Sequence, residues 1–168
     1  MQHRFEVINL ERDFETCTRF RKDSYFISFG SYSEFELENN SYKDRMTERL
    51  GCLPQGNCHL WMQDKIIGQT EMKLVSDTDV GYVSLLYLAP EYRGKGLGEL
   101  LHNHAVKVFS ALGKSTIQLS VSKSNRQAIS FYAKHGWRNL GPRPEKEQMF
   151  LMNYDLAGAS KGGRANGF

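Results

Sequence analysis

Three glycines lie within residues 94–98, with Arg93 and Lys95 beside them. A strand-like apolar segment, residues 83–88, precedes this turn, and residues 97–112 follow it with an apolar stripe of helical period. The turn is therefore expected at a helix N-terminus, where backbone N–H groups lack partners and the helix dipole is positive. Glycine matters because a Cβ would block close approach of a ligand or forbid a positive φ. The segment predicts a phosphate site built from main chain, with added charge from the two cations.

Two other glycine-rich phosphate motifs do not fit this turn. The dinucleotide fingerprint requires G-x-G-x-x-G, and the P-loop requires G-x-x-x-x-G-K-[ST]. Neither spacing is present at residues 94–98. A glycine cluster can also mark a tight strand-to-helix connection without any ligand, so the turn by itself does not identify a function.

A second segment of interest follows between residues 117 and 137. Residues 117–121 alternate apolar and polar side chains as a strand does. Ser124 to Gln127 reads S-x-x-Q, the pattern of a helix-starting capping box, and the short helix predicted after it ends at Gly136. The order is therefore glycine turn, helix, strand, helix.

Two motifs in these segments together resemble the GNAT superfamily of acyl-CoA-dependent N-acyltransferases. The first is Arg93-x-x-Gly96-x-Gly98, and the second runs from Asn125 through Ala128-Ile129-x-Phe131-Tyr132 to Gly136-Trp137. The resemblance covers about Tyr82 to Trp137. It implies acetyl-CoA as co-substrate, with the pyrophosphate on the glycine turn and the pantetheine arm along a bulged strand that ends at Leu88 and splays from its neighbour. The implied cofactor-binding residues are Leu86, Tyr87, Leu88, Arg93, Gly94, Lys95, Gly96, Leu97, Gly98 and Asn125.

The resemblance also implies roles for two residues of the second motif. Tyr132 stands at the family's proton-donor position, where a phenol can donate to the departing sulfur. The alternative is that its ring only packs against Trp137 and Ile129. Asn125 would contact the cofactor arm, or cap the helix that it begins, and we expect capping to be its main task.

The general base has a weaker basis in the sequence. A lysine-like amine with a pKa near 10.4 is neutral in about one molecule in 2,500 at pH 7, whereas an α-amino group with a pKa near 8 needs less help. The strand 82–88 contains no carboxylate. Glu71 is therefore the candidate base, on a strand face predicted to hold Ile67, Gln69 and Lys73 as well. The alternative is that this face is simply polar and solvated.

The rest of the pattern predicts a single α+β domain over residues 1–156, with a flexible tail over 157–168. The expected order is strand, two helices, three strands, helix, strand, helix and two strands. This order matches a GNAT-like mixed, mostly antiparallel sheet of about seven strands with helices on both faces. The less obvious elements are helices near 11–26 and 42–50 and strands near 57–62, 66–75 and 148–156, with a hairpin turn at Asp64-Lys65.

Bulk properties exclude several classes of protein. A net charge of +3 over 168 residues argues against a nucleic-acid partner. No apolar run approaches the roughly 18 residues of a membrane span, and no secretory signal is visible, so we expect a cytoplasmic protein without a membrane partner. Three cysteines without C-x-x-C spacing are expected as thiols packed in or near the core, and no metal site is expected.

These observations lead to one predicted function with two alternatives. The chain is expected to transfer an acetyl group directly from acetyl-CoA to a primary amine of a small molecule, in a ternary complex without an acyl-enzyme. The alternatives are an acetyltransferase for a protein or peptide N-terminus or lysine, and a non-catalytic acyl-CoA-binding sensor. An acceptor pocket is expected near the aromatic residues at 25–35, and a homodimer is kept as an open alternative to a monomer.

Overall fold

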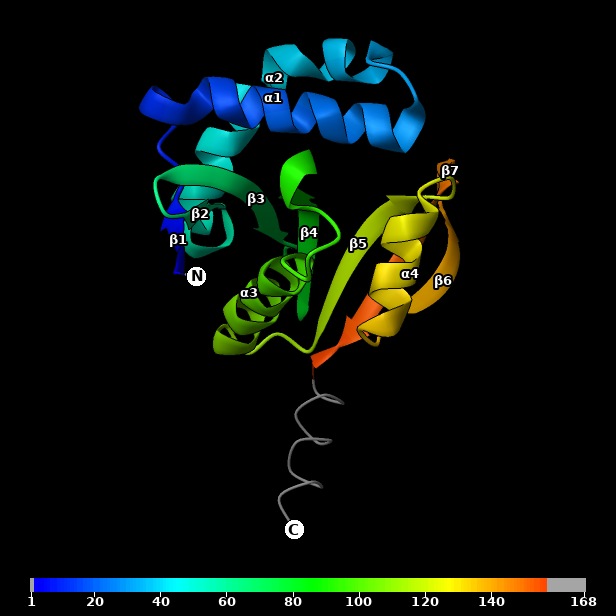
Figure 1. The fold of residues 1–168 in the computed structure, drawn as a ribbon. Helices are drawn as coiled ribbons and strands as arrows, with labels where there is room; N and C mark the ends of the chain where they lie inside the picture. Colours follow the sequence, from blue (N-terminus) through cyan, green and yellow to red (C-terminus); the bar gives the residue numbers. More distant parts are fainter. Residues whose placement is uncertain (1, 157–168) are drawn as a thin grey trace.

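The strands of the computed structural model form one sheet, in the order β1-β2-β3-β4-β5-β7-β6 (Figure 1). The structure describes residues 2–156, and the side chains among them except those of residue 34 and residues 36–40. The predicted tail at 157–168 lies outside the described residues. The elements are β1 (His3–Val7), α1 (Leu10–Phe29), α2 (Ser33–Cys52), β2 (Cys58–Met62), β3 (Lys65–Leu74), β4 (Val80–Leu88), α3 (Gly98–Ala111), β5 (Thr116–Ser122), α4 (Arg126–Lys134), β6 (Arg138–Arg143) and β7 (Lys146–Asp155).

Every neighbouring pair of strands is antiparallel except β4 and β5. These two strands run parallel. Residues Val80–Val83 pair with Thr116–Leu119, and beyond this point the two strands separate. The predicted fold class and element order are confirmed. The single parallel pair follows from the crossover through α3, since parallel neighbours need a long connection.

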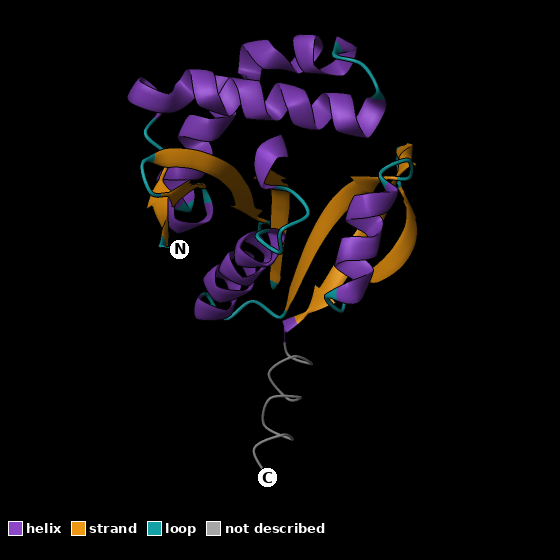
Figure 2. Cartoon of the chain, in the orientation of Figure 1, coloured by secondary structure: helices purple, strands orange, loops and turns teal. Residues whose placement is uncertain are grey.

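The helices cover both faces of the sheet (Figure 2). On one face, α3 and α4 pack against strand residues in an apolar core that includes Val83, Phe109 and Trp137. On the other face, Phe20 of α1 packs against Leu85 and Tyr87 of β4. Residues of β4 thus enter both cores, and this holds the strand between the two layers of helices.

The second helix begins at Ser33 rather than near Tyr42. Its first turns are rich in Glu, Asn and Ser and have no continuous apolar stripe, so periodicity gives little signal there. α1 ends at Gly30, whose positive φ of 71° lets its N–H bond to the carbonyl of Phe26. Phe35, in the first turn of α2, is buried. Tertiary packing therefore stabilises a helix that the local sequence pattern does not predict.

Two strand details also differ from the prediction. The β2–β3 turn is Gln63-Asp64, with Gln63 at φ 54°, one residue earlier than expected. The β2–β3 register shifts beside Ile67, because Leu60 pairs with Gly68 and Trp61 with Ile66. Ile67 therefore packs with Leu60 and Leu101 and does not share the face of Gln69 and Glu71.

Candidate active site

A bulge in β4 opens the sheet at the candidate site. The register moves from Glu71 opposite Leu85 to Met72 opposite Val83, so Ser84 is the extra residue. Beyond it, the backbone of residues 86–88 pairs with β3 on one side and has no strand partner on the side of β5. The predicted bulge and separation are confirmed, and an extended ligand could pair with this free edge.

The glycine loop has the geometry expected of an anion site. Gly94 and Gly96 adopt φ values of 71° and 79°, and neither has another atom within 4 Å of the place where a Cβ would lie. Gly98 starts α3, and a Cβ there would lie 3.3 Å from Cε2 of Phe131. The N–H groups of residues 94–98 donate to no described acceptor. They are therefore available to an anion at the positive end of α3.

The side chain of Arg93, expected to add positive charge at the loop, is held by partners on two other segments. Its Nη2 lies 2.9 Å from a carboxylate oxygen of Asp23, and its Nε donates to the carbonyl of Leu88 at 2.8 Å. The hydroxyl of Tyr87 donates to the same Asp23 oxygen at 2.6 Å. Arg93 thus ties the loop to α1 and to the end of β4, and contributes charge from a fixed position.

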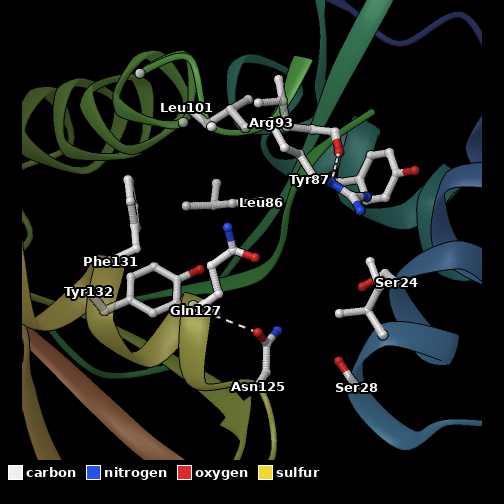
Figure 3. Close-up of a pocket in the computed structure, with 16 residues that line it drawn as sticks. Ser24, Ser28, Leu86, Tyr87, Arg93, Leu101, Asn125, Gln127, Phe131 and Tyr132 are labelled. Carbon is white, nitrogen blue, oxygen red and sulfur yellow. Dashed lines mark hydrogen bonds between the residues drawn. The ribbon is translucent and has the colours of Figure 1, made fainter. Parts of the chain in front are cut away.

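The glycine loop and the free edge of β4 border one cavity of about 340 Å³. The residues that line it come from α1, β4, the glycine loop, α3 and α4 (Figure 3). Of the predicted cofactor residues, the cavity is lined by Leu86, Tyr87, Leu88, Arg93, Gly94, Gly96, Gly98 and Asn125. Lys95 is exposed, and Leu97 packs in the core between α3 and the sheet, so neither lines the cavity.

One wall of the cavity was not expected from the sequence. Ser24, Ile27 and Ser28 of α1 line it, opposite the residues of α4. Their spacing puts them on one helix face, where two serines interrupt an otherwise apolar helix region. These two serines were the sequence signal that could have indicated this wall of the cavity.

Tyr132 closes the cavity from α4. Its side chain is 9% exposed, and in Figure 3 its hydroxyl points into the space beside Leu86. Burial raises the pKa of Tyr132 to about 12, so the phenol stays protonated at neutral pH. The hydroxyl bonds to no described residue, while the ring centroid lies 5.4 Å from that of Trp137. Packing and proton donation, posed as alternatives, are both compatible with this position.

Asn125 caps α4, as expected. Its Oδ1 accepts from the N–H of Ala128 at 3.2 Å. The capping-box prediction that placed the helix start at Ser124 is wrong by one residue, because Ser124 bonds instead to Ser122 and to the carbonyl of Ser28. The cap uses the oxygen of Asn125, and the amide nitrogen remains available on the cavity wall.

Glu71 lies behind the cavity, and the solvated alternative for it is wrong. The side chain is fully buried. One carboxylate oxygen lies 2.8 Å from Nη1 of Arg49, and the other accepts from Tyr42 and Gln69, each at 2.8 Å. Glu71 does not line the cavity. The geometry therefore gives no support to direct proton transfer from a bound amine to Glu71.

Arg21 connects Glu71 to the bulge. Its Nη1 lies 3.7 Å from Glu71 and donates to the carbonyl of Ser84 at 3.1 Å. Ser84 lines a smaller adjoining cavity of about 110 Å³, together with Ser120 and Tyr132. Glu71 is thus placed to hold Arg21, and through Arg21 the backbone at the point where the strands separate.

None of the three cysteines lines the cavity. Sγ of Cys17, a residue of α1, lies 3.6 Å from Nε2 of His59, but both side chains are buried and neither lines the cavity. Burial raises the pKa of the Cys17 thiol far above its usual range, which disfavours the reactive thiolate. Cys58 is also buried, whereas Cys52 is exposed, so the expectation of thiols packed in or near the core holds for Cys17 and Cys58 and is wrong for Cys52.

The aromatic residues at the turn between α1 and α2 form pairs rather than a cavity. Tyr25 lies against Phe29 and Phe35, with ring centroids 5.7 and 5.9 Å apart, and Phe26 stacks on Tyr32. None of them lines the cavities beside β4. Their predicted part in acceptor binding stays a prediction.

The part of the chain that the structure describes has neither a cluster of side chains that could bind a metal ion nor a helix that could span a membrane. Within residues 2–156, His, Cys, Asp and Glu side chains form no group of three that could hold a metal ion. In the same part of the chain, every helix is too short or too polar to cross a membrane.

Comparison with known proteins gives one family match. Residues 14–137 match the acetyltransferase (GNAT) family. A spermidine N(1)-acetyltransferase from Thermoplasma acidophilum is 27% identical over 75% of this chain and 83% of its own length. Peptidyl-lysine N-acetyltransferase YjaB from Salmonella typhimurium is 31% identical over 61% of this chain and 66% of its own length. Two further relatives are matched over only 28% and 49% of their length, so the chain spans half or less of some relatives.

A solved structure supports the same fold. The PaiA N-acetyltransferase of Thermoplasma acidophilum, in complex with coenzyme A, superposes with a TM-score of 0.75 at 21% identity. The superposition covers 92% of this chain and 99% of that chain. At this identity the likeness establishes the fold.

Proposed function

Since the chain belongs to the acetyltransferase (GNAT) family, we propose that it transfers an acetyl group from acetyl-CoA directly to a primary amine of a small molecule. One observation carries the proposal. A single cavity joins the free N–H groups of the glycine loop, the unpaired edge of β4 and the hydroxyl of Tyr132. These are the three features needed to hold an anion, to hold an extended arm and to donate a proton.

The residues present fit coenzyme A. The N–H groups of the loop 94–98 would hold the pyrophosphate, and no Cβ of Gly94 or Gly96 obstructs its approach. The backbone of residues 86–88 would hold the pantetheine arm as a neighbouring strand would. Asn125 would add its amide nitrogen while its oxygen caps α4. When bound, the cofactor supplies the acetyl thioester, and the protein supplies positioning and protons.

Tyr132 is assigned the proton donation. The departing thiolate has moderate basicity, near the 8.5 of a cysteine thiol, and a phenol kept protonated by burial can donate to it. Glu71 is assigned an indirect part. It holds Arg21 against the Ser84 carbonyl and so fixes the bulge beside the reacting groups. Without a described carboxylate on the cavity wall, the amine proton would leave through water.

Direct transfer is preferred to an acyl-enzyme. No cysteine lines the cavity, and the Cys17–His59 pair is buried elsewhere with a thiol that resists ionisation. Positioning two substrates side by side can supply much of the rate without a covalent step.

The test is acetyl-CoA-dependent thiol release over small amines, amino acids, polyamines and peptides, with calorimetry of coenzyme A binding. We expect binding and acceleration by at least one small amine. Acceleration only by peptides would favour the protein or peptide acetyltransferase. Slow hydrolysis that no amine accelerates would favour a sensor, which needs the glycine loop but not Tyr132. Absence of coenzyme A binding would overturn the proposal altogether.

A further inference from the structure

A cationic surface lies on the sheet face opposite α3 and α4, beside the smaller cavity. Ser120 lines that cavity, and its Oγ accepts from Nη1 of Arg143 at 3.0 Å. The same Nη1 lies 3.2 Å from the hydroxyl of Tyr82, which in turn lies 2.8 Å from Ser120 Oγ. Arg143, at the end of β6, is therefore one hydrogen bond away from the cavity wall that also holds Tyr132.

The charge of Arg143 is not neutralised within the described part of the chain. Its described partners are the neutral hydroxyls of Tyr82 and Ser120, and it forms no described ion pair. The described bonds use Nη1 alone, which leaves Nε and Nη2 free to bind both oxygens of an anionic group. The side chain is half-buried, so a bound anion would gain more from it than from an exposed arginine.

Other cations gather around the same tyrosine. Lys73 Nζ lies 5.1 Å and Arg143 Cζ 5.8 Å from the ring centroid of Tyr82. Burial, followed by the charges of Arg49, Arg143 and Arg45, lowers the pKa of Lys73. The buried carboxylate of Glu71 is already paired with Arg49. Among the described side chains, this surface therefore has an excess of positive charge beside the point where the amine would attack.

We infer that Arg143 binds an anionic oxygen group of the acceptor, so that the substrate is a primary amine that also carries a carboxylate or a phosphate, rather than a polyamine. This inference rests on the proposed function. A polyamine would bring two or more positive charges to a surface that repels them. An amine with one anionic group brings the charge that Arg143 lacks.

The same surface assists the chemistry. Nearby positive charges disfavour a protonated amine and lower its pKa, so a bound acceptor loses its proton more readily. This effect offsets the absence of a described carboxylate on the cavity wall. The anionic group then keeps the acceptor bound while its amine becomes neutral.

The experiment compares amines that differ only in the anionic group. The pairs are amino acids with their amides, β-alanine with propylamine, and phosphoethanolamine with ethanolamine, and spermidine is added. We expect the anionic member of at least one pair to have the higher kcat/KM, by about 10- to 100-fold. The carboxylate and phosphate pairs distinguish the two sources of charge. Equal or better turnover of spermidine and the neutral amines would overturn the inference and leave the proposed function standing.

Three variants identify the residue responsible. Arg143→Gln should raise KM for the anionic amine by about 10- to 100-fold and leave KM for its neutral partner unchanged. Arg143→Lys keeps the positive charge but lacks the paired N–H donors of a guanidinium group. Its KM for the anionic amine should lie between the values of the unaltered protein and of Arg143→Gln. Arg138→Gln, on an exposed position of the same strand, is the control and should change neither value. Coenzyme A binding, measured by calorimetry, verifies that each variant is folded. An Arg143→Gln protein that binds coenzyme A and still prefers anionic amines would refute the inference. If the unaltered protein acetylates no amine at all, the proposed function itself is refuted.

Discussion

Asp23 of α1 and Arg93 of the glycine loop form an ion pair with an N–O distance of 2.9 Å. Tyr87 of β4 donates to the same carboxylate oxygen. One carboxylate thus joins three of the segments that border the cavity: the first helix, the bulged strand and the glycine loop. The shape of the cofactor site depends on a residue far from the loop in sequence.

Replacing Asp23 should loosen the loop. Asp23→Asn removes the charge from a pair in which each side chain is 33% exposed, so we expect a loss of about 1 kcal/mol in unfolding free energy. The dissociation constant for coenzyme A should rise several-fold, measured by calorimetry. The exposed Asp64→Asn serves as the control. An unchanged affinity in Asp23→Asn would show that the loop holds its shape without α1.

Gly96→Ala should weaken binding through backbone strain. A Cβ at Gly96 meets no atom but must be held at φ 79°, which costs an ordinary residue about 1 kcal/mol. Gly141 is the matched control, because it also has a positive φ and open space but lies on β6, away from the loop. Both alanine variants should lose similar stability in urea unfolding, and only Gly96→Ala should lose coenzyme A affinity. Equal affinity in the two variants would contradict the loop's role.

Tyr132→Phe should lower kcat by about 10²-fold or more and leave coenzyme A affinity unchanged. The pKa of Tyr132, raised to about 12, means that the donating form persists at every pH below that value. Tyr132 should therefore cause no alkaline loss of activity up to about pH 10 in the unaltered enzyme. Tyr154→Phe, outside both cavities, is the control. Full turnover by Tyr132→Phe at saturating acetyl-CoA would remove it from the mechanism.

Glu71→Gln separates a positioning role from that of a base. Removing the carboxylate leaves Arg49 and Arg21 buried without a counter-charge, at an expected cost of about 3–5 kcal/mol. If Glu71 positions Arg21, kcat falls while the shape of the pH profile of kcat/KM stays the same. Disappearance of the acidic limb would instead make Glu71 the base. The exposed Glu91→Gln tests for non-specific effects.

Acid should destabilise the fold through His59. Burial lowers the pKa of His59 below its ordinary value of 6.5, so the unfolded chain binds the proton more readily than the folded one. Stability therefore falls as the pH drops below about 6.5, measured by urea unfolding between about pH 5 and pH 8. His102 and His104 shift in the same direction, so His59→Gln should reduce this slope and not abolish it.

The sequence predicted the backbone of the glycine loop and the start of α4 well, because these features depend on neighbouring residues. Gly94 and Gly96 adopt the positive φ values that the turn required, and Asn125 caps the helix that it begins. Alternation and turn residues located the strands to within a few residues. These signals are carried by neighbours in the chain, so one sequence is sufficient to show them.

The proposed acceptor half depends on long-range packing, which local sequence patterns mostly do not indicate. Nothing near Glu71 indicates that Tyr42 and Arg49 of α2 will bury it, or that Arg21 will reach the bulge from α1. Arg143 stands between two prolines in the sequence, and its contact with Ser120 joins strands that do not pair with each other. Such contacts are fixed by the sheet order, which periodicity does not supply.

The unpaired edge of β4 also bears on how the protein avoids aggregation. Free strand edges at the border of a sheet readily recruit strands from other chains. Here the free edge at residues 86–88 lies in the interior of the sheet, between β4 and β5, and α1 and α4 border the cavity on either side. Because this edge is flanked by β5 and by the two helices and does not lie at the border of the sheet, the protein keeps an open edge without exposing it to strands of other chains.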